Sequence, residues 1–388
     1  MEQRELLRKF GERYGDAEGT KVYFAPGRVN LIGEHIDYNG GYVMPCALTM
    51  GTYGVARKRD DRMCRFYSLN IGGDVVEISL EEIKPTEEND WTNYIKGVMA
   101  AFAERGFSMP RGFDLLLYGN IPSGAGLSSS ASVEVLIGFI LRDLYGFDVS
   151  NVDLALIGQQ AEHEFCGVNC GIMDQFAVAM GKEGHAIYLN TENLSYEYVP
   201  VKMDGVKIVL ASSNKKHSLA DSAYNDRRRE CEEALQALQK KLAIQELCQL
   251  DKQTFDANSD GIQDEVCYRR ARHAVYENER TKKAVELLRD NELMEFGMLL
   301  NESHRSLSAD YEVTGKEMDA LAAAAWKQNG VLGSRITGGG FGGCTVSLVE
   351  EQWIDNFVEQ VGKEYTDKTG LKADFYVVEI GGGPVVYC

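Results

Sequence analysis

The sequence predicts an α+β protein of two packed domains, and three observations support this prediction. The chain has 388 residues, which suits one large or two medium domains, each with its own core. Strand-like and helix-like segments are intermixed without a regular βαβ alternation, which disfavours a doubly wound parallel sheet. The composition also changes near residue 200. We therefore expect domains over 1–200 and 201–388, with a binding site between them.

Apolar spacing predicts the elements of the first domain in turn. A helix is expected over 4–14 because Leu6, Leu7 and Phe10 recur at helical spacing, and a strand follows at 21–24. Alternating β-formers between charged or glycine-containing turns predict strands within 51–79. The remaining expected elements are a helix at 91–104 with one apolar stripe, a strand at 112–120, helices at 128–145 and 152–165, and strands within 184–212.

The second domain is expected to begin with a highly charged, mostly helical stretch over 217–329. The chain then returns to a strand, a helix at 350–366 and a final strand with the sequence DFYVVEI. The last ten residues fit no pattern and stay unassigned. The sequence contains no fixed-period repeat and no Pro/Ser-rich linker.

The charge of the chain excludes some classes of partner. There are 41 Lys and Arg against 59 Asp and Glu, a formal net charge of −18. A protein that binds nucleic acid or a membrane surface would need a basic face, so we expect neither partner. Neither a signal peptide nor a transmembrane helix is predicted. Nine cysteines without an export signal indicate reduced thiols, so a cytoplasmic location is expected.

A first loop rich in glycine and serine, NIPSGAGLSSSAS at 120–132, lies between an expected strand and an expected helix. Its glycines allow close backbone approach, and its serines fall where the free N–H groups of a helix start favour an anion. A serine hydroxyl there can also coordinate Mg²⁺. The loop lacks the lysine of a Walker A motif and the spacing of a Rossmann motif. Taken alone, it is consistent with a phosphate site or with an ordinary serine N-cap.

Two other segments concentrate glycines or charges. Five glycines fall within 338–343, more than a hairpin requires, which favours backbone lying against another loop or a ligand over a plain surface hairpin. Arg28, Glu34, His35 and Asp37 fall within ten residues. Such a cluster suits a ligand with many hydroxyl groups and a nearby phosphate, and the alternative is a solvated turn with an Arg–carboxylate pair.

A fourth segment places Glu162 and Asp174 on either side of a glycine turn. One carboxylate could hold Mg²⁺ while the other acts as a base. Zinc bound by His163, Cys166 and Cys170 is an alternative, disfavoured because no second CxxC or His pair has structural-zinc spacing.

Together these segments resemble the galactokinase group of the GHMP small-molecule kinase family. GRVNLIGEHIDYNGG at 27–41 is similar to its sugar signature, NIPSGAGLSSSAS to its phosphate loop, ITGGGFGGC to its third motif and GIMDQF to the segment around its catalytic aspartate. The resemblance implies a two-domain GHMP kinase fold, in which an N-terminal α+β domain with a left-handed βαβ crossover packs against a ferredoxin-like C-terminal domain.

The resemblance also implies an activity, the Mg²⁺- and ATP-dependent phosphorylation of the anomeric hydroxyl of α-galactose, which yields galactose 1-phosphate and ADP. The site residues that it implies are Asp174 and Arg28 for catalysis, Glu34, His35, Asp37, Gly171, Asp174 and Tyr224 for the sugar, Ser123, Gly124, Ala125, Gly126, Leu127, Ser128, Ser129 and Ser130 for the triphosphate, and Ser130 and Glu162 for Mg²⁺. Whether Asp174 is a true base or an orienting group stays open.

Two alternative functions also stay open. One is a sibling kinase acting on N-acetylgalactosamine or arabinose. The other is a sensor that binds galactose and ATP without turnover. The phosphate loop of such sensors lacks a Ser-Ala pair near its end, and this chain retains Ser130 and Ala131, which favours the enzyme. The sequence does not determine the oligomeric state, although a monomer is favoured.

Overall fold

The computed structural model describes residues 1–86, 90–122, 124–215 and 220–387. Ser123, which the resemblance assigns to the phosphate loop, lies outside these residues. Among the helices of the described ranges, none combines the length and the apolar surface that a bilayer span requires.

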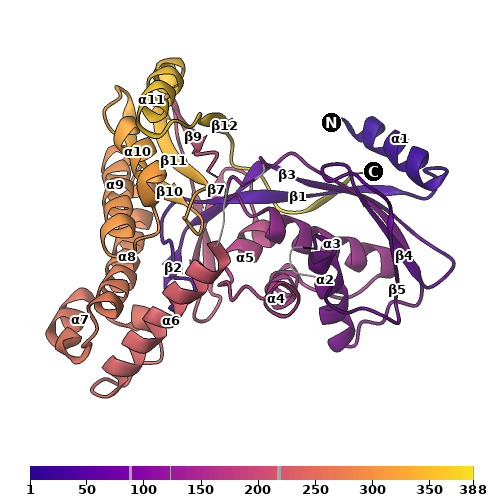
Figure 1. Ribbon diagram of the computed structural model, residues 1–388, viewed down its shortest axis with the longest axis horizontal. Helices are drawn as coiled ribbons and strands as arrows, with labels where there is room; N and C mark the ends of the chain where they lie inside the picture. Colours follow the sequence, from indigo (N-terminus) through magenta and orange to yellow (C-terminus); the bar gives the residue numbers. More distant parts are fainter. Residues whose placement is uncertain (87–89, 123, 216–219, 388) are drawn as a thin grey trace.

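A six-stranded sheet forms the scaffold of the first domain (Figure 1). Its order is β13-β1-β3-β6-β4-β5, and its strands are β1 (Lys21–Asn30), β3 (Pro45–Lys58), β4 (Met63–Ser68), β5 (Val76–Ser79), β6 (Phe113–Gly119) and β13 (Val385–Tyr387). The pair β4–β6 is parallel, and the chain crosses between these two strands through β5 and α2 (Thr92–Glu104). The handedness of this crossover stays a prediction.

Helices cover both faces of this sheet (Figure 1). On one face α1 (Gln3–Tyr14) buries Leu6 and Phe10 against Val22 and Leu116. The other face carries α2 together with α3 (Ser129–Tyr145), α4 (Asn151–Ala161) and α5 (Met173–Met180). A small separate sheet has the order β2-β7-β8, with β2 (Tyr42–Val43), β7 (His185–Asn190) and β8 (Tyr196–Pro200).

The second domain is built on an antiparallel sheet of order β10-β11-β9-β12. Its strands are β9 (Val206–Ser212), β10 (Val331–Thr337), β11 (Cys344–Glu350) and β12 (Asp374–Val378). Between β9 and β10 lie α6 (Ala220–Gln239), α7 (Lys252–Asn258), α8 (Glu265–Arg289), α9 (Leu293–Ala309) and α10 (Gly315–Ala325), and α11 (Ile354–Thr369) precedes β12. This is the βαββαβ order of a ferredoxin-like domain, with the first crossover expanded into five helices.

The two domains share an apolar core. Val29 and Met44 from the first domain belong to the same buried cluster as Ile208 and Val346 from the second. Because these side chains are completely or almost completely buried, the two sheets are held in a fixed relation to each other. The loops at their junction therefore form a defined site.

Three sequence-based boundaries were wrong. The strand expected at 21–24 continues to Asn30, since a register shift between Pro26 and Arg28 lets β1 pair with β3 past the proline. The helix expected at 152–165 changes at Glu162 into one π-helical turn (Glu162–Cys166). The helix expected at 350–366 begins at Ile354, after a 3₁₀ turn (Glu351–Trp353).

The last residues of the chain, which fit no pattern, form β13. Val385, Val386 and Tyr387 pair antiparallel with β1 at the outer edge of the first domain's sheet. The chain therefore ends in the first domain rather than in the second (Figure 1). The domain boundary at residue 200 stays a prediction, except that β13, which follows the second domain in the sequence, belongs to the sheet of the first domain.

Candidate active site

A cavity of about 140 Å³ opens where the loop after β1, the start of α5, α6 and the loop between β10 and β11 meet. It is lined by Arg28, Glu34, His35, Asp37, Glu162, Val168, Cys170, Gly171, Met173, Asp174, Tyr224, Gly338 and Gly339. Every residue that the sequence assigns to catalysis or to the sugar is in this lining. The lining residues come from four separate segments of the chain, which the fold brings to one place.

Arg28 and Asp174 form a two-pronged ion pair at the wall of this cavity. Arg28 donates from Nε to Oδ1 of Asp174 at 2.7 Å and from Nη2 to Oδ2 at 2.6 Å. The remaining nitrogen of Arg28, Nη1, donates to the carbonyl of Gly126 in the phosphate loop at 2.8 Å. The hydroxyl of Ser128 also donates to Asp174. Burial lowers the pKa of Arg28, but the charge and hydrogen bonds of Asp174 outweigh it and raise the pKa overall.

Glu34 is held by partners that sequence reasoning missed. Its Oε1 accepts from Nη2 of Arg335 at 2.9 Å and from the backbone N–H of Gly338 at 2.7 Å. Both side chains are buried, and burial raises the pKa of Glu34 against the opposing effect of Arg335. Arg335 lies in a strand-like run just before the glycine cluster, and its pairing with Glu34, 301 residues earlier, follows only from the tertiary structure.

His35 has a protein partner at each ring nitrogen. Nδ1 lies 2.8 Å from the hydroxyl of Tyr38, and Nε2 lies 3.1 Å from the carbonyl oxygen of Gly339. Burial, followed by the nearby His273, lowers the pKa of His35 to about 3, so the ring is neutral at physiological pH. A carbonyl only accepts, and Nε2 therefore carries the proton.

Asp37 and Gly171 depend on each other. A Cβ at Gly171 would stand 1.9 Å from Oδ2 of Asp37, so a larger residue at this position would displace the carboxylate. The same oxygen accepts a long hydrogen bond from the backbone N–H of Met173. Burial and then the charge of Asp174 raise the pKa of Asp37 to about 7. Space and charge in the cavity thus favour a ligand that donates hydrogen bonds.

A second cavity, of about 430 Å³, adjoins the first and shares Arg28 and Asp174 with it. The described phosphate-loop residues Gly124, Ala125, Gly126, Leu127, Ser128, Ser129 and Ser130 line it, together with residues 339–342. The two glycine loops touch: a Cβ at Gly338 would stand 2.7 Å from the carbonyl oxygen of Gly126. The excess of glycines therefore serves a close approach of two backbones at the start of α3, as the functional interpretation expected.

A third cavity extends from the phosphate loop along the first domain's sheet. Trp91, Tyr94 and Ile71 contribute its aromatic and aliphatic wall, and Ser129 and Ser130 connect it to the second cavity. Sequence reasoning missed this cavity because it assigned Trp91 to the apolar stripe of a core helix. Tyr94 lies three residues after Trp91 and therefore on the same face of the helix. This second aromatic ring was the available signal that the start of the helix faces a site.

Comparison with known proteins now adds to this geometry. The galactokinase galactose-binding signature matches residues 8–58, the GHMP kinases N terminal domain matches 93–182, and the GHMP kinases C terminal domain matches 284–367. Galactokinase of Bacillus subtilis (strain 168) is 52% identical over 380 residues, which are 98% of this chain and 97% of that protein. Galactokinase of Enterococcus faecalis (strain ATCC 700802 / V583) is 53% identical over 379 residues, 97% and 98% of the two chains.

The chain belongs to the galactokinase family. Membership confirms the resemblance of the motifs, and the chain is an ATP-dependent sugar kinase. The crystal structure of Lactococcus lactis galactokinase complexed with galactose matches with a TM-score of 0.96 and 46% identity, over 98% of this chain and 99% of that one. The Methanococcus jannaschii mevalonate kinase, with a TM-score of 0.64 and 16% identity over 93% and 98% of the two chains, shares the fold. The predicted GHMP kinase fold is confirmed.

The magnesium assignment in this galactokinase-family site depends on Ser130 and Glu162. Ser130 lies beside Glu162, and Glu162 is buried next to Glu134 and Asp174. Burial and the charge of Asp174 raise the pKa of Glu162 to about 7, so this corner carries excess negative charge that a divalent cation would offset.

The described residues contain no group of three or more His, Cys, Asp or Glu side chains arranged to hold a metal by themselves. Two protein oxygens leave most positions of an octahedral ion to phosphate and water, which is how Mg²⁺ commonly binds beside nucleotides. Ser130 and Glu162 therefore fit a magnesium ion that arrives with its nucleotide. The side chains proposed as zinc ligands make other contacts instead. His163 Nε2 contacts the carbonyl oxygen of Cys170, and the thiol of Cys170 faces Glu162.

Proposed function

We propose that this chain transfers the γ-phosphoryl group of ATP to the anomeric hydroxyl of galactose, giving galactose 1-phosphate and ADP. The observation that carries the proposal is the position of the Arg28–Asp174 pair, which belongs to the walls of both the first and the second cavity. A sugar in the first cavity and a triphosphate in the second would meet at this pair. Relatives named as galactokinases, and a solved galactokinase complexed with galactose, support the choice of sugar.

The first cavity has the chemistry of a monosaccharide site. Glu34 and Asp37 offer carboxylate oxygens, and Tyr224 offers a phenol. Carboxylates accept hydrogen bonds from hydroxyl groups, and a buried site that pairs with a particular hydroxyl rejects the epimer that lacks it. We therefore propose Glu34, His35, Asp37, Gly171, Asp174 and Tyr224 as the sugar-binding residues.

ATP would occupy the second and third cavities together, since Ser129 and Ser130 line both. The amides at the start of α3 and of the loop from Gly124 to Ser130 would receive the phosphates, and the aromatic wall of Trp91 and Tyr94 would receive the base. Ser130 and Glu162 would hold Mg²⁺, which when bound supplies charge neutralisation at the phosphates.

The proposed chemical roles follow from the hydrogen bonds of Asp174. Its carboxylate would orient the sugar hydroxyl toward the γ-phosphorus and take up the proton as the new O–P bond forms. Arg28 fixes the position of that carboxylate from two directions and presents positive charge toward the transferring group. Ser128 completes the support, since its hydroxyl donates to the same carboxylate.

The test is an ADP-release assay with ATP, Mg²⁺ and a panel of galactose, glucose, arabinose and N-acetylgalactosamine. We expect fast turnover with galactose and a rate on glucose lower by about 10³-fold or more, because the wrong epimer leaves buried polar groups unpaired. Asp174→Asn should abolish sugar-dependent ADP release while leaving the fold intact. Equal rates on galactose and glucose, or near-normal turnover by Asp174→Asn, would contradict the proposal. A clear preference for arabinose or N-acetylgalactosamine would identify a sibling kinase instead.

A further inference from the structure

Four side chains, of which Cys231, Tyr311 and His35 are buried and Tyr38 is half-buried, form a continuous line of hydrogen bonds that ends in the first cavity. The thiol of Cys231 lies 3.1 Å from the hydroxyl of Tyr311, which lies 2.9 Å from the hydroxyl of Tyr38. Tyr38 in turn lies 2.8 Å from Nδ1 of His35. The line ends at the carbonyl of Gly339, 3.1 Å from Nε2 of His35. His35 and Gly339 line the cavity, whereas Cys231, Tyr311 and Tyr38 stand behind it.

The two ends of the line determine the direction in which its hydrogens point. The Gly339 carbonyl only accepts, so Nε2 of His35 donates to it and Nδ1 of the neutral ring accepts. The hydroxyl of Tyr38 must then donate to Nδ1, and its oxygen accepts from Tyr311. The Tyr311 oxygen accepts from the thiol of Cys231. The sulfur in turn accepts a long contact from Nδ2 of Asn39 at 3.7 Å, which agrees with this direction.

Burial makes this direction costly to change. Cys231 and Tyr311 are 1% and 0% exposed, so water cannot replace a lost partner. Removing one hydroxyl leaves the next oxygen without its donor, and that hydroxyl is then free to point elsewhere. As a result, the proton on His35 would no longer be fixed on one ring nitrogen, and the Gly339 carbonyl would no longer be held in one orientation.

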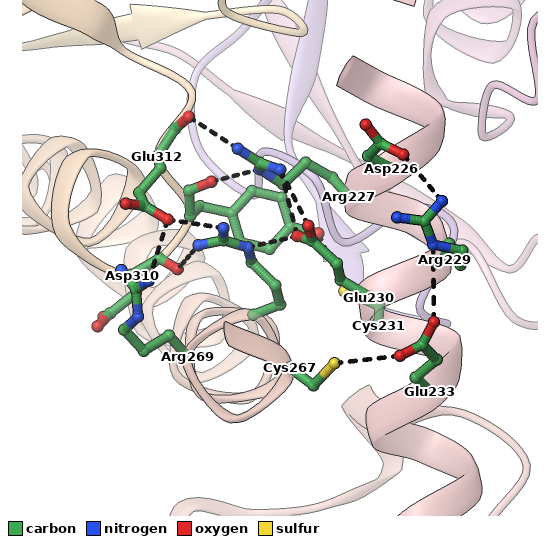
Figure 2. Close-up of polar contacts among 12 residues, drawn as sticks. Asp226, Arg227, Arg229, Glu230, Cys231, Glu233, Cys267, Arg269, Asp310 and Glu312 are labelled. Atoms are coloured by element: carbon green, nitrogen blue, oxygen red, sulfur yellow. Dashed lines mark hydrogen bonds and ion pairs between the residues drawn. The ribbon is translucent and has the colours of Figure 1, made fainter. Parts of the chain in front are cut away.

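The segment that carries Tyr311 is anchored from outside by three arginines. The carbonyls of residues 309–312 at the end of α9 each accept an arginine N–H: Arg269 binds the first, Arg270 the second, and Arg227 the third and fourth. Figure 2 shows Arg227 and Arg269 directed at this segment, with Arg227 paired to Glu230 and Arg269 paired to Glu312. The carbonyls of the last residue of α9 and of the three residues after it therefore each have an arginine donor.

The carboxylates complete this anchor. Arg270, which is almost completely buried, donates to Glu230 and to Glu312 at 2.7 Å each. The same segment continues to Val313, whose carbonyl accepts from the backbone N–H of Phe341 at 2.7 Å. Tyr311 is thus fixed both against α6 and α8 and against the glycine loop that supplies Gly339. Such rigidity suits a positioning role.

We infer that Cys231, Tyr311 and Tyr38 are positioning residues for the sugar, acting through the hydrogen-bond line that orients His35 and the Gly339 carbonyl. The inference rests on the proposed sugar site. These three residues do not line the second cavity, and the His35 ring that they orient lines the first cavity and not the second, so their main effect should fall on sugar binding.

Tyr311→Phe and Tyr38→Phe test the inference by removing one hydroxyl each while keeping the ring. Calorimetry should give a galactose Kd raised about three- to ten-fold, the usual worth of one buried hydrogen bond. The Kd for ATP and the kcat at saturating galactose should stay within about two-fold of the unaltered chain. Tyr14→Phe is the matched control, since its hydroxyl also donates to a buried carbonyl, that of Leu115 at 2.8 Å, but on the far face of the first domain's sheet.

Cys231 gives a second test that keeps the ring system intact. Cys231→Ala removes the donor and should raise the galactose Kd, whereas Cys231→Ser retains a donor and should restore it to within about two-fold. An unchanged galactose Kd in folded Tyr311→Phe, or equal effects of Cys231→Ala and Cys231→Ser, would overturn the inference. So would an equal effect of Tyr14→Phe. Absence of galactose binding by the unaltered chain would instead refute the proposed function.

Discussion

Arg28 uses all three guanidinium nitrogens at once, Nε and Nη2 toward Asp174 and Nη1 toward Gly126. A lysine has one charged atom and cannot reproduce that fork. We expect Arg28→Lys to lower kcat about 10²-fold, since the carboxylate loses its orientation and the transferring group loses a planar cation. The measurement is kcat at saturating galactose and ATP, with a thermal melt to check the fold. A decrease of less than three-fold would show that charge alone suffices.

Asp37 makes the stability of the ligand-free protein depend on pH. Burial and Asp174 raise its pKa in the folded chain from 3.8 to about 7. Its contribution is therefore fully present below about pH 4 and is lost as the pH rises through about 7. Asp37→Asn never ionises, so its urea midpoint should fall less than that of the unaltered chain between pH 5 and pH 8. Parallel curves for the two proteins would contradict this assignment.

Local motifs explain why so much of the cavity could be predicted at the level of single residues. Glu34, Asp37 and Asp174 each stand in a short segment whose glycines and charges are unusual together. Arg335 and Tyr311 were not predicted as site residues: Arg335 lies in β10 just before the glycine cluster, Tyr311 follows the end of α9, and both reach the site through tertiary contacts. Partners of that kind follow from packing, which local sequence patterns do not encode.

At the scale of elements, the loop between β10 and β11 depends on glycine for two separable reasons. Gly340 has a φ of +76°, and a Cβ there would stand 2.4 Å from the carbonyl oxygen of Val313. Gly73 has a similar φ of +81° but nothing within 4 Å. Both alanine variants incur the left-handed backbone cost of about 1–2 kcal/mol, and only Gly340→Ala adds a clash with backbone.

We therefore expect Gly340→Ala to lower the melting temperature several degrees more than Gly73→Ala, and to raise the KM for ATP because this loop lines the second cavity. The two variants are compared by thermal melts and by ATP titrations at saturating galactose. Equal melting temperatures and an unchanged ATP KM would mean that the loop absorbs the extra carbon by moving.

The element boundaries that were mispredicted share a physical cause. Pro26 ordinarily ends a strand, yet β1 continues past it because a bulge restores pairing with β3, where Gly51 leaves room for the carbonyl of Ala25. The π-turn after Ala161 likewise departs from the helical pattern and brings Glu162 to the cavity. Such irregularities are set by what lies opposite in the fold, so periodicity along the chain does not reveal them.

Over the whole molecule, the net charge of −18 should repel ATP, which is itself an anion and is the proposed substrate. The proposed site resolves this locally: Arg28 borders both cavities, and the phosphate loop meets the start of α3, where unpaired amides favour anions. Glu162 lies buried beside Asp174, whose charge raises its pKa. Affinity for the nucleotide should therefore depend on the divalent ion more than on the overall field.

The end of the chain supplies the last prediction. Removing residues 385–388 deletes β13 and exposes the edge of β1, which carries Arg28 seven residues from the start of the strand. We expect a melting temperature several degrees lower and a tendency to aggregate, because an unpaired edge strand offers its N–H and C=O groups to other chains. Tyr387→Ala, which keeps the backbone pairs but removes a ring that packs against the α1 cluster, should lose only part of that stability.

If the truncated chain melts like the full one and stays monodisperse in light scattering, β13 does not contribute to the joining of the two domains. If Tyr387→Ala accounts for the whole loss, side-chain packing rather than strand pairing holds the tail in place.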